Sequence, residues 1–72
     1  MLLSADSIIA DFMQKAGVWK TQETHYLVLQ ALTTNDARRA DYALQAALAR
    51  QSANVLEAEA HAIRQQIGER AA

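Results

Sequence analysis

Apolar residues recur at spacings of three and four near the start of the chain, which is the pattern of an amphipathic helix. The apolar positions of this stretch are Ala5, Ile8, Ile9, Phe12, Met13 and Ala16. Ser4 precedes them and can cap a helix, because its hydroxyl accepts from backbone N–H groups that lack helical partners. Gly17 follows them, and glycine often closes a helix. The pattern therefore predicts a first helix over residues 5–16.

A second apolar stretch follows a short connection. Thr21 is a candidate N-cap, and Glu23 lies in the first turn of the helix that it would open. Between Tyr26 and Leu32 the apolar residues point in nearly every direction, which is typical of a helix covered by its neighbours. The residues of 33–36 (Thr-Thr-Asn-Asp) all favour turns and caps. We predict a second helix over 22–32 and a loop after it.

The segment 37–67 has helical composition throughout, but its large apolar residues change face. The first set is Leu44, Leu48 and Val55, and the second, about 90° further round at 100° per residue, is Leu56, Ile63 and Ile67. One interpretation is a break at 51–54, with Asn54 as a cap and Glu57 as its reciprocal partner. The other is an unbroken helix whose two parts contact different neighbours, and we favour it because no residue requires a break.

These elements predict an all-α fold with a single domain over 1–72. The fold is a small three-helix bundle, or a four-helix bundle if 51–54 is a break, with a long alanine-rich C-terminal helix. The absence of proline supports this class. Sixteen of the apolar residues are alanine, so the core is small, and the chain has no cysteine to form disulfides. We therefore expect the chain to gain stability from another protein or from copies of itself.

Charge and hydropathy narrow the expected partners. The net charge is −1, so no general attraction to nucleic acid or to anionic lipid is expected. No apolar run approaches the length of a membrane span, and the start lacks the basic region of a secretory signal. We expect a cytoplasmic protein.

No group of residues predicts catalysis. The only neutral bases, His25 and His61, have no recognisable nucleophile motif nearby, and no glycine-rich phosphate loop exists. Glu57 and His61 share one helical face, a spacing that is more typical of an exposed charged pair than of a metal site. We expect neither an enzyme nor a cofactor or metal.

The predicted function is protein binding by a helical docking face, as an adaptor, regulator or assembly factor. Trp19 either plugs the junction between the first two helices or is an exposed binding anchor. A helix over 37–67 would be about 46 Å long, and two short helices cover only part of it. The uncovered end would present an apolar stripe to a partner. The candidate partner-binding residues are Trp19, Val55, Leu56, Ile63 and Ile67.

A helix-turn-helix DNA-binding regulator is the alternative. The predicted second helix, the loop and the start of the third helix have the outline of that motif. The candidate base-reading residues are Asn35, Arg38, Arg39 and Tyr42. Two acidic residues, Asp36 and Asp41, flank the arginines, and DNA-binding domains normally carry a basic patch instead.

A third interpretation comes from the segment between Tyr42 and Ile67, which contains Tyr-Ala-Leu-Gln and Val-Leu-Glu-Ala-Glu-Ala-His-Ala-Ile. It resembles the second helix of the small type III secretion needle co-chaperones, short helical hairpins that hold a needle subunit together with a second chaperone. The resemblance covers 26 of the 72 residues. The spacing from the tyrosine to Leu-Glu and a separate N-terminal helix depart from the family pattern. The resemblance implies a hairpin and a structural role in a larger complex.

Overall fold

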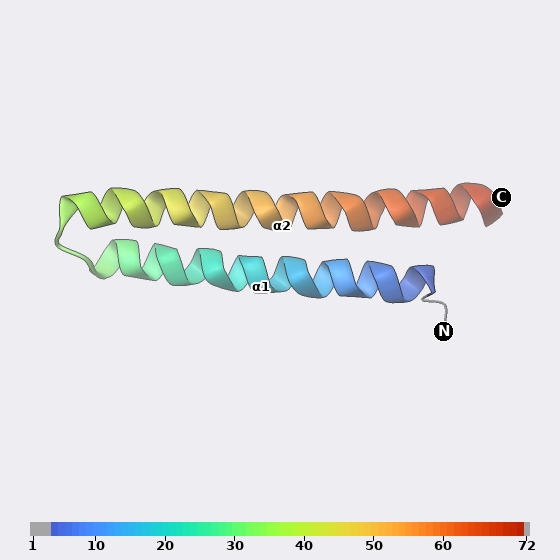
Figure 1. Ribbon diagram of the computed structural model, residues 1–72, viewed down its shortest axis with the longest axis horizontal. Coiled ribbons are helices and arrows are strands. Elements are labelled where there is room, and N and C mark those ends of the chain that lie inside the picture. Colours follow the sequence, from blue (N-terminus) through green and yellow to red (C-terminus); the bar gives the residue numbers. More distant parts are fainter. Residues whose placement is uncertain (1–3, 72) are drawn as a thin grey trace.

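The protein is an antiparallel hairpin of two long helices (Figure 1). A computed structural model describes residues 4–71. Helix α1 comprises Ala5–Leu32, helix α2 comprises Asp36–Ala71, and residues 33–35 connect them. The two helices lie side by side in a molecule of 55 × 23 × 13 Å. The all-α class is confirmed, but the expected three or four helices are wrong, because the described residues form two.

The predicted boundary between helices 5–16 and 22–32 does not exist, because α1 continues through it. Gly17 has no positive φ and lies inside the helix. The hydroxyl of Thr21, the expected cap, donates to the carbonyl of Gly17 at 3.1 Å, as a threonine inside a helix can. Residues on both sides of Gly17 pack on α2, and this packing supports a helix that local signals alone would end.

Polar side chains cap both helices. The Ser4 hydroxyl oxygen accepts from the backbone N–H of Ser7 at 3.1 Å, as the sequence predicts. The Asn35 Oδ1 atom accepts from the backbone N–H of Arg38 at 3.0 Å and so caps α2. The predicted loop is present over 33–35, whereas Asp36 is the first residue of α2 and suits the positive end of the helix dipole.

Helix α2 passes through 51–54 without interruption. Ser52 donates its hydroxyl proton to the carbonyl of Leu48 at 3.0 Å, inside the helix. Asn54 is an exposed helical residue and caps nothing in the structure. Of the two interpretations of this helix, the structure has the unbroken one.

The helices meet along a seam made mostly of alanine. Its buried residues are Ile9, Ala16, Ala46, Ala49, Ala53 and Ala60. Two sets of them repeat every seven residues, at 9 and 16 in α1 and at 46, 53 and 60 in α2, which is the repeat of a two-stranded coiled coil. Small side chains let two helices approach closely, but they remove little apolar area from water. The hairpin therefore leaves its large apolar residues outside the seam.

The expectation that the end of the long helix is uncovered needs correction. Helix α1 has 28 residues and spans about 42 Å, so it runs beside most of α2. Leu56 and Ile63 are consequently half-buried. Val55 and Ile67 remain exposed, by 56% and 38%.

Candidate protein-binding groove

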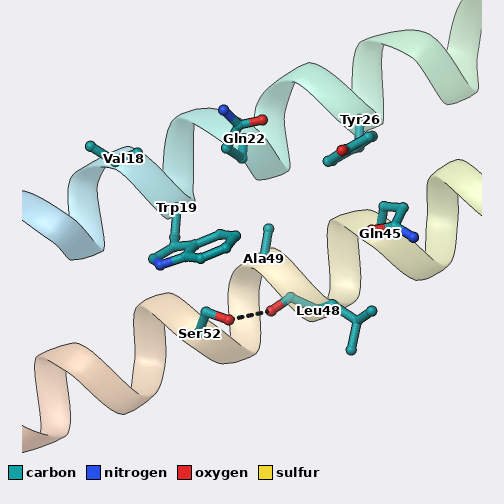
Figure 2. Close-up of a pocket in the computed structure, with 8 residues that line it drawn as sticks. All are labelled: Val18, Trp19, Gln22, Tyr26, Gln45, Leu48, Ala49 and Ser52. Carbon is teal, nitrogen blue, oxygen red and sulfur yellow. Dashed lines mark hydrogen bonds between the residues drawn. The ribbon is translucent and has the colours of Figure 1, made fainter.

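An open groove lies between the two helices on one flank of the seam (Figure 2). We call it the Trp19 groove; its lining residues are Val18, Trp19, Gln22, Tyr26, Gln45, Leu48, Ala49 and Ser52. Four come from α1 and four from α2, so the hairpin itself creates the groove. None of the eight carries an ionisable acid or a basic group at neutral pH.

Trp19 forms the central wall of the groove. Its indole extends from α1 toward Ala49 and Ser52 of α2, and the side chain is 42% exposed (Figure 2). The ring fills space between α1 and α2 and still faces solvent. The junction that it was expected to plug does not exist, because α1 is continuous, and the role of Trp19 as a binding anchor stays a prediction. Its expected place in a connection is wrong, because it lies within α1.

Few polar side chains surround the indole, and one of them, Ser52, already has a hydrogen-bond partner. The Ser52 hydroxyl donates within its own helix, so it leaves an apolar floor beside the ring. Toward the loop, the rings of Tyr26 and Tyr42 lie 6.4 Å apart between centroids at an interplanar angle of 30°. Aromatic pairs at this separation attract one another and hold the groove's loop end in place.

A neighbouring hollow extends the groove along α2 toward the chain termini. Trp19 and Ser52 line both, and the hollow adds Gln51, Val55 and Leu56. We call the groove and the hollow together the Trp19 face. Val18, Leu48 and Val55 protrude from it with exposed fractions of 57%, 47% and 56%. The face thus combines protruding apolar side chains with hollows floored by alanine and serine.

The opposite flank of the seam is charged. Lys20 pairs with Glu57, and Arg50 pairs with Glu23 at 3.3 Å between Nη1 and Oε2. Lys20 follows Trp19 directly, and consecutive helical residues are about 100° apart, so the two side chains flank the seam on different sides. In both pairs the cation is exposed and the carboxylate is partly buried. The pairs join α1 to α2 on this flank and make it the charged one.

The structure brings together three of the five residues predicted to bind a partner. Trp19, Val55 and Leu56 lie on the Trp19 face, whereas Ile63 and Ile67 lie further along α2 and do not line it. Sequence reasoning missed Val18, Tyr26 and Leu48. A signal for the groove was present in the spacing of Phe12, Trp19 and Tyr26, which repeats every seven residues. The predicted helix break at 17–21 concealed this repeat.

The residues of the DNA-binding alternative have other contacts. Asn35 caps α2, and Arg39 donates to the Asp36 carboxylate at 3.1 Å and to the Thr33 carbonyl at 3.2 Å. Tyr42 packs on Tyr26, and Arg38 is exposed. The two helices run antiparallel, whereas those of a helix-turn-helix cross at about 90–120°.

The residues considered for a metal site are Glu57 and His61. Glu57 pairs with Lys20, and His61 lines a separate hollow with Met13 and Arg64. Across residues 4–68, whose side chains are described, no three histidine or carboxylate side chains gather closely enough to hold a metal ion. Neither helix, over its described length, combines the length and apolar character needed to cross a membrane.

Comparison with known proteins adds no family assignment. No protein-family model, curated protein or solved structure matches this chain.

Proposed function

We propose that this chain is a non-enzymatic protein-binding module of the cytoplasm that docks a helical partner on its Trp19 face. The observation that carries the proposal is the groove itself, which both helices line with apolar and uncharged side chains around a half-exposed tryptophan. Soluble monomers rarely expose a continuous apolar surface without a binding role.

The composition of the face supports binding of a protein. Tryptophan and tyrosine are the residues that most often dominate binding energy at protein interfaces, especially where neighbouring contacts exclude water from them. A groove between two helices accepts a third helix, whose apolar side chains enter between those of the hairpin. The absence of charged side chains in the groove means that docking requires no ion to lose its water.

A comparison of two variants in a capture experiment tests this function. The chain is immobilised as wild type, as Val18→Lys, which places a charge on the face, and as Val28→Lys, which places the same charge elsewhere on α1. Val18 and Val28 are similarly exposed, by 57% and 50%. The captured partner is either a protein from the native cell or a second copy of the chain. We expect wild type and Val28→Lys to retain the same partner and Val18→Lys to lose it. Equal retention by all three would contradict the proposal.

DNA binding remains the second candidate, with the exposed Arg38 as the basic residue that would contact phosphate. A mobility-shift assay at low salt, where phosphate contacts are strongest, tests it. A shift that Arg38→Ala abolishes and that Val18→Lys leaves intact would favour DNA binding over protein binding.

A structural role in a larger complex, as in the secretion co-chaperones, is the third candidate. The observation that favours it is the hairpin, which is the fold that the resemblance of 42–67 implies. Such a role would appear in the capture experiment as a foreign protein that remains bound stoichiometrically through purification.

A further inference from the structure

The hairpin exposes more surface than a compact protein of its mass. Its accessible area is 5620 Å². A compact monomer of 7.9 kDa exposes about 4,400 Å² by the usual scaling of area with mass. The excess is thus about 1,200 Å², and a standard protein interface covers about 800 Å² on each partner. One interface of ordinary size would therefore reduce the accessible area of this chain to nearly that of a compact monomer of the same mass.

The exposed large apolar residues are not spread evenly along the molecule. They are Met13, Val18, Trp19, Leu27, Val28, Leu29, Leu32, Leu44, Leu48, Val55 and Ile67. All but Met13 and Ile67 belong to 18–55, the half of the hairpin nearer the loop. Four of them, Val18, Trp19, Leu48 and Val55, line the Trp19 face, and Val28 does not. A partner on this face therefore meets its apolar side chains in the loop half.

The charge distribution favours an identical partner. In a two-fold symmetric pair the same patch from each copy takes part, so every charge in the patch would meet a like charge nearby. The Trp19 groove carries none, and the ion pairs Lys20–Glu57 and Arg50–Glu23 lie on the other flank. Protruding side chains such as Leu48 and hollows floored by Ala49 occur on the same face, as self-complementary packing requires.

We propose that a second copy of this chain covers the Trp19 face, with the loop ends of both hairpins together, to form a four-helix bundle. A two-fold axis parallel to the helices places α1 of each copy on α2 of the other. This arrangement lays the Trp19 faces of the two copies against each other. The proposal rests on the proposed function, because it names the partner of the same face.

The oligomeric state of the purified chain tests the pairing. Sedimentation at micromolar concentration should show a dimer for wild type and for Val28→Lys. Val18→Lys should raise the dimer dissociation constant at least about a hundredfold, because it buries two uncompensated charges. Leu48→Lys, on the other helix, should do the same. Circular dichroism checks that each variant remains helical. If one of the two lysine variants loses its helix content, the test relies on the other one.

A monomeric wild type would overturn self-pairing, and so would a dimer that both Val18→Lys and Leu48→Lys leave intact. These results do not decide the proposed function. A wild-type monomer that still retains a foreign protein, in a manner that Val18→Lys abolishes, would refute the second copy as partner and support protein binding on the same face. A monomer that retains nothing would refute both.

Cross-linking tests the orientation, and the lack of cysteine makes it direct. Gln22 of α1 and Ser52 of α2 line the same groove. Because the proposed pair lays α1 of one copy on α2 of the other, it brings Gln22 of one copy near Ser52 of the other. A mixture of Gln22→Cys and Ser52→Cys chains should yield a disulfide dimer that contains one of each. A dimer that forms instead from Gln22→Cys alone would overturn the parallel placement of the loop ends.

Discussion

Alanine sets how closely the two helices approach. Ala46, Ala49, Ala53 and Ala60 are almost fully buried, with exposed fractions of 3% or less. Where two helix backbones meet this closely, a methyl group fits between them and a larger side chain does not. The same residues contribute little burial, and so the seam aligns the helices more than it stabilises them.

A larger side chain in the seam should therefore be costly. Ala53→Leu is expected to lower the free energy of unfolding by about 1–3 kcal/mol, because the added carbons must force the helices apart. Ala62→Leu, an exposed position of the same helix, is the control and should change it by less than about 0.5 kcal/mol. Urea unfolding at one protein concentration measures both. Unchanged stability of Ala53→Leu would contradict close packing at this residue.

Asn35 has a defined structural role as the N-cap of α2. Asn35→Ala should lower the free energy of unfolding by about 0.5–2 kcal/mol, because the backbone N–H of Arg38 loses its acceptor. Asn35→Asp keeps an acceptor oxygen and should retain nearly full stability. Thermal unfolding by circular dichroism compares the three proteins. Equal losses in both variants would show that the side chain acts through something other than capping.

At the scale of the element, the continuity of α1 is the feature on which the site depends. Phe12, Trp19 and Tyr26 share one flank only if the helix passes through Gly17 without a break. The space around Gly17 is open, since a Cβ atom added there would meet no other atom within 4 Å. Nothing in the packing requires glycine at this position.

Gly17→Ala should accordingly stabilise the protein, by about 0.5–1 kcal/mol, since alanine restricts the unfolded chain and favours helix. Gly68→Ala, near the end of α2, should have a smaller effect because terminal turns open easily. Chemical unfolding of both variants measures the difference. A loss of stability in Gly17→Ala would support the helix end that the sequence pattern predicts there.

At the scale of the whole molecule, two helices of 28 and 36 residues enclose a small core, so the isolated hairpin is expected to be only marginally stable. If the hairpins pair, folding and association are coupled, and stability depends on concentration. Each tenfold increase in chain concentration should then add about 1.4 kcal/mol per dimer to the free energy of unfolding.

The thermal midpoint of the wild type should thus rise with protein concentration. The Val18→Lys chain should unfold at a lower temperature that is independent of concentration, because its pairing is lost. Melting curves followed by circular dichroism over a hundredfold range of concentration provide the comparison. A midpoint of the wild type that stays constant over this range would contradict coupled folding and association.

The sequence by itself determined what depends on neighbouring residues. Helix content follows from the absence of proline and from periodic apolar positions, and the Ser4 cap and the turn after Leu32 follow from side chains that bond their own backbone. Trp19 was proposed as a contact residue because tryptophan often dominates binding energy at interfaces, and Val55 and Leu56 because a long helix was expected to have an uncovered end; their role in binding stays a prediction.

Only the tertiary structure decided the number of helices and the face that each one buries. Gly17 and Thr21 carry the local signals of a helix end, worth about 1 kcal/mol, and packing of Ala16 and its neighbours on α2 outweighs them. Which alanines form the seam is likewise settled by the partner helix: Ala53 is buried and Ala62 exposed, although the two residues are identical. Burial is a property of two surfaces in contact, and one helix cannot specify it alone.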